Sequence, residues 1–504
     1  MKKILSIILL IISLFALSCK NNSSSSIGRI GEITVDPYGV APLSAVYTTE
    51  TVNAVPITVK VKGLYGEPDI IHTYPAGYGT EFEIHGMFPE SENTIEVNDG
   101  GRIITKNVNV GSISANGVTI QKKYDVAVNN LPEEKYKNNP ELYIVGDAFF
   151  VGISKNGYIR YIMKNYNLSK ISIDSKKLYL YPSWGNKIIN LLGKTIINYP
   201  QGGHHDTIKI DDNYIFCSYG FYGSMEEGLT KIDSLGNRIG NEQSIGTLLK
   251  DIVYQNNDPN EIEIFNKIVF GSAVDNYYQY NGQVKNVDWF HSNSLVYDSE
   301  KDILYISGRM RGVVAIKYSE WKLLWWMVDN SLKLKIDVTI PSDNVLPYDY
   351  HFKDLKSLEP YRVKGDAIND GPKNQHALFL LANGNLGMFD NQGDEATNPN
   401  GSRYVEYKIT GTHGNYTAQK VYEYRDASLY SRLRSDIDFT GETHQNLLLC
   451  YADNNAKIIE VEKETKKILF RLYLPFGSYR VDKMPLYYDE GRVYSEDCNL
   501  KNLN

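Results

Sequence analysis

The sequence predicts an all-β protein with an N-terminal Ig-like β-sandwich followed by a six-bladed β-propeller. A chain of 504 residues exceeds what one ordinary hydrophobic core supports, so two domains are expected. Tyrosine (39) and glycine (40) are abundant, and segments that alternate apolar and polar residues outnumber segments with helical periodicity. From residue 119 onward a hairpin of one style also recurs, which is typical of radially repeated blades.

The chain begins with the features of an export signal. Two lysines precede an apolar run over residues 4–17, which is short for a membrane-spanning helix, and a serine-rich polar stretch follows Cys19. The junction "FALSC" resembles a bacterial lipoprotein box, although Ala16 stands where the commonest form has leucine. We therefore expect a signal peptide over 1–19, lipidation of Cys19 and a tether over 20–27. The protein would then be exported to the bacterial cell envelope, facing the periplasm or the surface, with the lipid as its only membrane contact. Ordinary cleavage without lipidation is the alternative.

Residues 28–118 are expected to form the sandwich, because short alternating segments follow one another there. In "PITVKVKG", Ile57, Val59 and Val61 share one face of a strand and polar residues occupy the other. The turn residues "NDGG" follow at a spacing typical of a small sandwich. Residues 119–504 are assigned to the propeller.

Four segments of the second domain share an apolar strand, a polar turn and a second strand. They are "FFVGISKNGYIRYIM" (149–163), "LTKIDSLGNRIG" (229–240), "VVAIKYSEWKLLWWM" (313–327) and "KIIEVEKETKKILFRLYL" (457–474). Recurrence at such intervals favours radial repetition, and the length of the domain suits six blades. One large irregular sandwich is the alternative. Helix is expected to be minor, with its best candidate over 243–255.

Three further hairpins begin with histidine. They are "GHHDTIKIDDNYIFCSYG" (203–220), "FHSNSLVYDSEKDILYISGR" (290–309) and "QHALFLLANGNLGMFDN" (375–391). His205, His291 and His376 occupy matching points, and equivalent points of different blades lie around one axis, so the three imidazoles are expected to converge at the channel mouth. A lone histidine is usually structural, but three at one register favour a site. His204 should point to the opposite face of its strand, and Asp206 either orients an imidazole or caps a turn.

Arg309 ends the hairpin that begins at His291, so antiparallel pairing should return its guanidinium to the histidine cluster. Together with the Asn293 amide, these groups make a donor-rich cup for a tetrahedral oxyanion. A metal fits less well, since a cation about 4 Å from Arg309 would be repelled by about 4 kcal/mol at an effective dielectric constant of about 20. The same repulsion lowers the imidazole pKa from about 6.5, which leaves a neutral histidine available at pH 7 as a nucleophile or base.

The charge balance excludes one class of partner. The net charge is -7 and the chain has no basic arm or stripe, so nucleic acid is not expected as a ligand. Two other functions remain open on the residues alone. One is a metal-dependent hydrolase of the envelope with the three histidines as ligands, and the other is a propeller that binds ligands without catalysis.

With these residues in view, the chain resembles the bacterial aryl-sulfate sulfotransferases that work without phosphoadenosine sulfate. The segments "DPYGVAPLSAV" and "GMFPESENTIEV" are similar to the N-terminal domain of that family. The segments "HHD", "DWFHSNSLVYD", "SGR" and "NQHALFLLANGNLGMFDN" are similar to its propeller motifs and occur in the family order. The resemblance covers nearly everything after the signal, and the chain has no phosphate-cradling glycine-rich loop that would argue against it.

The resemblance implies a ping-pong transfer of a sulfuryl group from a phenolic sulfate ester to a phenolic acceptor, through a sulfohistidine and without a cofactor. His376 would be the nucleophile, a choice that the residues alone do not make. The groups that would hold the sulfuryl oxygens are His205, His291, Asn293 and Arg309. His204 is a further substrate-binding candidate, and "SYRVDKMPLY" resembles a family ending that could bring Tyr479 to the channel, with ordinary strand packing as the alternative.

The cysteines differ from the pattern of some family members, which carry a short disulfide loop. The nearest pair here is Cys450 and Cys498, and whether these two pair is open. A homodimer is likewise left open by the sequence.

Overall fold

The structure is a computed structural model that describes residues 31–174, 176–182, 185–218, 227–269, 279–280, 283–284, 289–332, 354–393, 400–452, 454–492 and 494. The expected signal peptide and tether, Cys19 and Cys498 lie outside these residues. Strand is the dominant element within them, which confirms the predicted all-β class. No helix in this part of the chain is long and apolar enough to cross a bilayer.

Two facing sheets form the N-terminal domain. One contains β1 (Ile33–Val35), β2 (Ser44–Thr48) and β5 (Glu81–His85), and the other contains, in spatial order, β4 (Ile70–Tyr74), β3 (Ile57–Val61), β6 (Ser91–Asp99) and β7 (Arg102–Val110). In β3 the buried residues are Ile57, Val59 and Val61, and the two residues between them are part-exposed, as the alternation predicted. Phe82 and Ile84 from β5 belong to the same apolar core. A small hairpin of β8 (Ile113–Ala115) and β9 (Val118–Ile120) follows.

The other described strands form sheets of mostly four strands, which are antiparallel except for one parallel pair at the edge of the fifth sheet. The first sheet contains β11 (Leu142–Gly146), β12 (Phe150–Ile153) and β13 (Ile159–Met163) with β36 (Arg480–Met484), and the second contains β14 (Leu168–Asp174), β15 (Lys177–Pro182), β16 (Gly185–Asn190) and the first part of β17 (Thr195–Ile210). The third sheet contains the second part of β17 with β18 (Asn213–Ser218), β19 (Gly228–Ile232) and β20 (Gln243–Ser244), and the fourth contains β23 (Ser292–Asp298), β24 (Ile303–Gly308), β25 (Gly312–Lys317) and β26 (Lys322–Met327). The fifth sheet contains β28 (His376–Leu380), β29 (Leu386–Asp390), β30 (Arg403–Thr410) and β31 (Thr417–Arg425) with β27 (Lys364–Gly365), and the sixth contains β32 (Asp436–Thr440), β33 (Asn446–Tyr451), β34 (Lys457–Glu462) and β35 (Ile468–Tyr473) with β10 (Val126–Asn129). A two-stranded pair, β21 (Gln279–Tyr280) and β22 (Gln283–Val284), lies apart from them.

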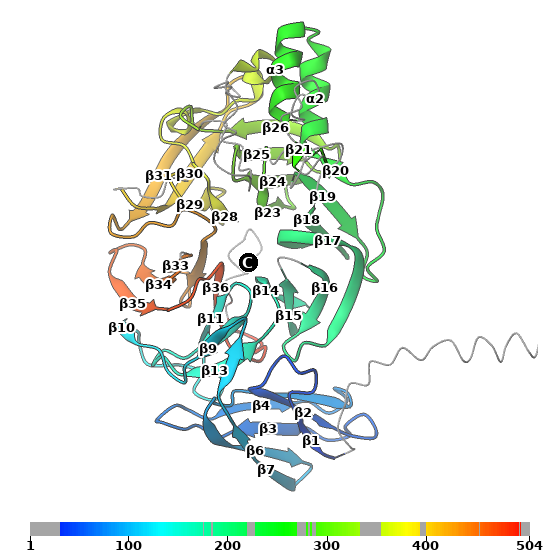
Figure 1. Cartoon of the computed structure of the whole chain (residues 1–504), viewed down its shortest axis with the longest axis vertical. Helices are drawn as coiled ribbons and strands as arrows, with labels where there is room; N and C mark the ends of the chain where they lie inside the picture. The colour runs from blue at the N-terminus through cyan, green and yellow to red at the C-terminus, as the bar shows by residue number, and fades with distance from the viewer. Residues whose placement is uncertain are drawn as a thin grey trace, which may run out of the picture.

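These sheets succeed one another around a common centre, in chain order, and the N-terminal domain lies at one end of the molecule (Figure 1). The first sheet is completed by the last strand, because β36 pairs along the whole of β11 from Leu142↔Met484 to Gly146↔Arg480. The strands β14, β17, β23, β28 and β36 lie nearest to this centre in Figure 1, and β32 contacts β28 and β36. Residues at the ends of these inner strands are therefore neighbours in space although they are far apart in sequence.

One sequence expectation about the hairpins of the second domain needs correction. The segment 229–240 is not a regular hairpin: after β19 the return limb is reduced to one bridge between Ile232 and Arg238, and β20 pairs with the start of β19 instead. Its polar, glycine-containing composition offers few side chains that favour a strand. The predicted helix exists as α2 (Ile245–Gln255), which begins where the Ser244 side chain accepts a hydrogen bond from the Thr247 amide.

A second helix, α3 (Pro259–Val269), was not predicted. Its "EIEI" run alternates like a strand, but Asp258 provides an N-cap and Pro259 stands at the first helical position, where its missing N–H costs nothing. The buried faces of α2 and α3 pack with β18, β24 and β26 in one apolar cluster. Two short 3-10 helices, Lys356–Tyr361 and Asp366–Ile368, complete the described helices.

The two domains meet around the buried side chain of Arg160 on β13. Its Nε donates to the carbonyl of Gly86 at 2.8 Å and its Nη1 donates to the carbonyl of Pro68 at 3.0 Å, so both acceptors belong to the N-terminal domain. The guanidinium also lies 4.2 Å from the centre of the Phe88 ring. Burial lowers the Arg160 pKa only to about 10, so the guanidinium still carries its charge at neutral pH.

Candidate active site

Each histidine hairpin contains a β-bulge close to its histidine. The register shifts at His205 in β17, two residues after His291 in β23, and directly after His376 in β28. Backbone φ is 55° at His205, 58° at His291 and 49° at Ala377, values that are uncommon for residues other than glycine. The sequence predicts one register for the three histidines, and the structure does not show it. His205 lies within a bulge, His291 precedes its strand and His376 opens its strand. Bulges redirect side chains, and here they replace strict alternation as the cause of convergence.

His205, His291 and Tyr479 form a hydrogen-bonded chain. Nε2 of His205 lies 2.9 Å from Nε2 of His291, and Nδ1 of His205 lies 2.8 Å from the Tyr479 hydroxyl. One hydrogen must lie between the two facing imidazole nitrogens, so the tautomers of the two rings are coupled. His205 and Tyr479 are buried, whereas His291 is part-exposed. The chain therefore leads from a buried phenol to an imidazole that solvent or a ligand can reach.

His376 is held in one tautomer. Its Nδ1 lies 2.9 Å from Oδ1 of Asn391 and 3.2 Å from the backbone carbonyl of Asn374. The amide nitrogen of Asn391 donates to the carbonyls of Ser431 and Arg434 at 2.8 and 3.1 Å, which fixes the amide with its oxygen toward the ring. Both groups that face Nδ1 can only accept, so Nδ1 carries the hydrogen and Nε2 carries the free lone pair.

The electrostatic environment keeps these rings neutral. Burial, followed by the neighbouring His291, His376 and Arg480 among others, places the pKa of His205 well below the usual value for histidine. The pKa of His376 is also well below that value, mainly because of burial, with Arg309 and Arg480 adding to the effect and the hydrogen bond to Asn391 opposing it. Two guanidinium groups close to neutral imidazoles make a site that favours an anion.

Arg309 lies where antiparallel pairing predicted. Its backbone amide donates to the carbonyl of His291 at 2.9 Å, and its side chain is almost wholly buried. Tyr479 also reaches the cluster: its ring centre is 5.5 Å from that of His205 and 6.2 Å from that of His376. Sequence reasoning therefore identified a set of residues that the fold does bring together.

Three other candidates take part in holding this set. Asn293 is fully buried, and its amide nitrogen donates to the carbonyl of Gln375 at 2.8 Å, which ties β23 to the residue before His376. His204 does not occupy an opposite face free of His205; the bulge lets the two rings meet edge to face at 5.0 Å, with Nε2 of His204 3.3 Å from the Ser218 carbonyl. The Asp206 carboxylate accepts hydrogen bonds from the backbone amides of Thr207 and Leu295. Of the two predicted roles, these bonds agree with capping of the backbone.

Asn391 and Arg480 are the members of the cluster that the sequence reasoning missed. Arg480 is buried beside Tyr479, with its guanidinium 4.7 Å from that ring, and donates to Asp436 at 2.9 Å. It stands next to Tyr479 in the segment already singled out. Asn391 ends the hairpin that His376 opens, so the antiparallel argument that located Arg309 would have located it.

The ring geometry does not suit a shared metal. Nε2 of His205 and Nε2 of His291 point at each other across one hydrogen bond, so neither lone pair is directed at a common ion. No group of three or more histidine, cysteine or acidic residues in the described ranges is arranged to hold a metal. Cys217 and Cys450 are buried free thiols whose pKa is raised by burial.

Comparison with known proteins identifies the family. The model of a family described as arylsulfotransferase matches residues 127–480, which is most of the chain. The chain belongs to the arylsulfotransferase family. The Ig-like domain of arylsulfotransferases matches residues 32–107, so the N-terminal sandwich of this arylsulfotransferase family member is Ig-like, as predicted.

Two curated relatives carry the name arylsulfate sulfotransferase AssT. The protein from Escherichia coli O6:H1 (strain CFT073) is 30% identical over 164 residues, which cover 31% of this chain and 26% of the relative. The protein from Lelliottia amnigena is 27% identical over 198 residues, which cover 36% of this chain and 32% of the relative. The chain thus spans about a third or less of the length of the curated relatives that it matches.

Solved structures show only distant likeness. A protein of unknown function from Bacteroides thetaiotaomicron is 9% identical with a TM-score of 0.30, covering 86% of this chain and 94% of that one. Citrobacter koseri AztD is 8% identical with a TM-score of 0.31, covering 87% and 100%. Scores this low carry no argument about the fold or the site.

Proposed function

We propose that this family member is an aryl-sulfate sulfotransferase that transfers a sulfuryl group from a phenolic sulfate ester to a phenolic acceptor through a sulfohistidine at His376. The observation that carries the proposal is the hydrogen-bond pattern of this ring: Nδ1 donates to Asn391 and Asn374, so Nε2 is left as a lone-pair nucleophile. The ring is buried and neutral and lies near the charge of Arg309. An anionic sulfate ester is attracted to that charge, and a neutral imidazole can attack it.

In the first half-reaction, the Nε2 lone pair of His376 attacks sulfur and forms the N–S bond. The bond between sulfur and the aryl oxygen breaks, and that oxygen leaves with the electron pair. Its proton comes from the hydrogen-bonded pair of His291 and His205, which gains that proton from solvent when the anionic ester binds, and Tyr479 holds the pair through its hydrogen bond with Nδ1 of His205. Charge spreads over the three remaining sulfuryl oxygens in a loose transition state, which donors from Arg309 and the neighbouring imidazoles stabilise.

The second half-reaction reverses these steps with a different phenol. The acceptor gives its proton to His291, its oxygen attacks sulfur, and Nε2 of His376 leaves with its lone pair restored. Nδ1 keeps its hydrogen on Asn391 throughout, so the ring needs no tautomer change between the two halves. Kinetics should be ping-pong, since the first phenol leaves before the second reacts.

We also propose that the sheets of the second domain form a six-bladed β-propeller. Side chains on one inner strand accept from the backbone of the next: Asp206 accepts from the amide of Leu295 at 2.8 Å, and Ser294 accepts from the amide of Leu378 at 2.9 Å. The pairing of β36 with β11 supports the same arrangement, because it joins the last strand to the first sheet. We place the domain boundary just after the β8–β9 hairpin, slightly later than the sequence estimate at residue 118.

Export and lipidation at Cys19 complete the proposal. The leader supports them through its lysines, apolar run and lipoprotein-like junction. Metabolic labelling with a fatty acid would test them, with Cys19→Ala as the unlabelled control.

The decisive test of the chemistry is mass spectrometry of protein that is quenched after exposure to 4-nitrophenyl sulfate without an acceptor. We expect one sulfuryl group per chain, located on the peptide that contains His376 and absent in His376→Ala. His444→Ala is the matched control, because His444 is part-exposed and bonded to the Tyr494 carbonyl, away from the cluster. A sulfuryl group on another residue, or unchanged turnover in His376→Ala, would remove His376 as the nucleophile.

A further inference from the structure

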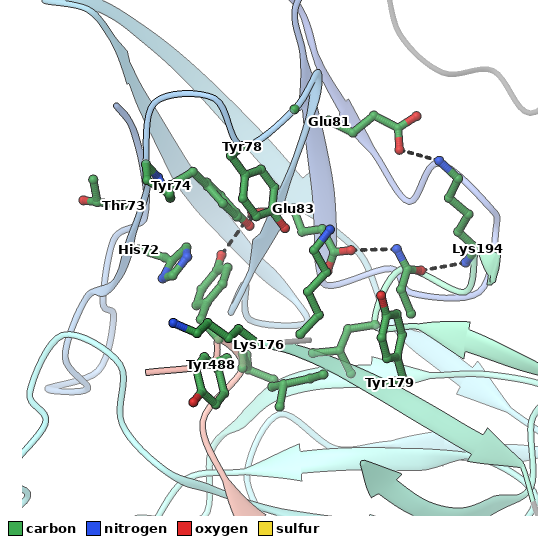
Figure 2. A pocket seen from close by; sticks show the side chains of 18 of the residues that line it. His72, Thr73, Tyr74, Tyr78, Glu81, Glu83, Lys176, Tyr179, Lys194 and Tyr488 are labelled. Atoms are coloured by element: carbon green, nitrogen blue, oxygen red, sulfur yellow. Dashed lines mark hydrogen bonds and ion pairs between the residues drawn. The ribbon is translucent and has the colours of Figure 1, made fainter. Parts of the chain in front are cut away.

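A cavity of about 720 Å³ lies between the N-terminal domain and the sheet that contains β14, β15 and β16. One wall is built from β4, β5 and the turn between them, and the other from β15, from the segment after β16 and from the segment that follows β36. Figure 2 shows these walls from close by. None of the histidine-cluster residues lines the cavity, so it is a separate site.

Aromatic rings form much of the lining. Tyr78, Tyr179 and Tyr488 come from three different segments and are each part-exposed in the cavity. Tyr78 contacts Tyr74 with ring centres 4.6 Å apart, and Tyr488 stacks on Tyr494 with ring centres 5.6 Å apart. The rings that face the cavity are therefore supported by fixed neighbours and offer apolar faces at little entropic cost.

The charged groups of the lining cancel. They are Glu81, Glu83, Glu490, Lys176, Lys177 and Lys194. Lys194 donates to Glu81 at 2.5 Å (Figure 2), and Lys176 donates to Glu490 at 2.9 Å; all four residues line the cavity. Burial lowers the His72 pKa to about 4, so this ring adds no charge at neutral pH. An ionic ligand would find no net charge to balance its own.

Glu83 shows how firmly the polar part of the lining is fixed. Its carboxylate accepts from the Asn190 side chain at 2.6 Å, and Asn190 in turn accepts from the backbone amide of Lys194 at 2.8 Å. This network crosses from β5 of the first domain to β16 of the second, and Lys194 closes it on Glu81. Fixed acceptors and donors beside aromatic faces suit a ligand that carries both hydroxyls and C–H surfaces.

We propose that this interdomain cavity binds a neutral oligosaccharide of two to four sugar units. A pyranose ring has C–H faces that pack on tyrosine and hydroxyl groups that bond to paired carboxylates and ammonium groups. A purely apolar ligand would bury those charged groups without hydrogen bonds, which is costly, and a charged ligand would lack a counter-charge. The volume lies within the range usual for small-ligand sites.

The test uses the full chain and three neutral trisaccharides, cellotriose, maltotriose and chitotriose, with trigalacturonate as the charged comparison. Binding is measured by isothermal titration calorimetry and by saturation-transfer NMR. We expect at least one neutral trisaccharide to bind with a Kd of about 0.1–1 mM. Tyr179→Ala should weaken that binding at least tenfold, whereas Tyr473→Ala, at a tyrosine that is 44% exposed elsewhere, should not change it.

Lys177→Trp provides a second variant whose folding is not at risk, because Lys177 is an exposed lining residue and its Nζ lies 4.8 Å from the centre of the Tyr78 ring, so the larger side chain occupies the cavity beside that ring. Loss of binding in Lys177→Trp, with an unchanged melting temperature, supports the site. Any of three results overturns the inference: no neutral trisaccharide binds at concentrations tenfold above the expected Kd, trigalacturonate binds more tightly than all of them, or Tyr179→Ala and Lys177→Trp bind as the unaltered protein does. The inference stands apart from the chemistry at His376, so sulfuryl transfer is expected to persist in both variants.

Discussion

Replacing Asn391 by alanine should slow catalysis without removing any group that touches the substrate. The change deletes the acceptor at 2.9 Å from Nδ1 of His376 and leaves only the Asn374 carbonyl at 3.2 Å. The ring can then rotate and exchange tautomers, and a fraction of the molecules will carry the hydrogen on Nε2, where it blocks attack. Loss of a partner that orients a functional histidine typically costs about 10- to 100-fold, and we expect kcat to fall by that factor while KM changes little.

The free energy of unfolding should fall as well, and the size of that loss can be calculated from the same hydrogen bonds. Asn391 makes hydrogen bonds to His376, to the Ser431 carbonyl and to the Arg434 carbonyl, all of them buried. At about 0.5–1.5 kcal/mol each, three bonds amount to about 1.5–4.5 kcal/mol. A lower kcat could then reflect partial unfolding, so the control must be destabilised to the same extent.

Asn93→Ala is that control. Asn93 is fully buried in the N-terminal domain, where it accepts from the Phe88 amide and donates to the carbonyls of Phe88 and Ser91. Its loss should lower the melting temperature similarly, with kcat retained. Turnover is followed by the release of 4-nitrophenol from 4-nitrophenyl sulfate with phenol as acceptor, and unfolding by circular dichroism. Equal kcat values for Asn391→Ala and Asn93→Ala would refute the tautomer argument.

Three further predictions follow from the relay, from the buried histidines and from the domain junction. Tyr479→Phe should reduce kcat about tenfold or more with phenyl sulfate and far less with 4-nitrophenyl sulfate, because the better leaving group needs less proton donation; equal losses with both donors would argue against the relay. Buried neutral histidines take up protons only on unfolding, so the free energy of unfolding should fall as pH drops through the unfolded histidine pKa of about 6.5. Since the folded His72 pKa is about 4, this residue takes up as much as one proton on unfolding between pH 4 and 6.5, and His72→Phe should remove that uptake. The free energy of unfolding, measured by urea titration at several pH values, should then depend less steeply on pH than in the unaltered protein, and an unchanged dependence would contradict the prediction. Arg160→Met should lower the free energy of unfolding by about 2–4 kcal/mol, because two buried carbonyls lose their donor, while kcat stays the same; an unaltered calorimetric melting temperature would show that Arg160 does not hold the junction.

Local patterns carried most of what the sequence could predict about the fold. Ile57, Val59 and Val61 alternate into the core because a strand has a period of two, and that rule needs no tertiary information. The "EIEI" run of α3 obeys the same rule and misleads, since packing against α2 and the Asp258–Pro259 start decide for helix. The segment 229–240 was predicted to return as a second strand, but its return is reduced to the bridge between Ile232 and Arg238, because its turn-like composition has few residues that favour a strand.

The site was predictable to the extent that it depends on hairpin ends. Arg309 returns to His291 because antiparallel strands bring their ends together, and the same rule applies to Asn391 and His376. The bond between His205 and Tyr479 joins residues 274 positions apart. The arrangement of the sheets around a centre and the pairing of β36 with β11 bring those two together, and recurring hairpins predicted that arrangement; the bulge at His205 leaves no signal in the local sequence.

The low pKa of His205 raises the question of how a ring that is neutral in the free protein can take part in proton donation. The charge of the bound sulfate ester accounts for this. An anion about 4 Å from an imidazole stabilises the protonated ring by about 4 kcal/mol at an effective dielectric constant of about 20, and about 1.4 kcal/mol corresponds to one pKa unit. Arrival of a sulfate ester thus raises the pKa of the His205–His291 pair by about three units, which shifts the pair toward its protonated form. In the proposed mechanism His376 stays neutral, because Asn391 and Asn374 already accept its Nδ1 hydrogen and its Nε2 lone pair would be directed to sulfur as the ester binds. One anion would thereby set both proposed roles, with the His205–His291 pair as the acid and His376 as the nucleophile.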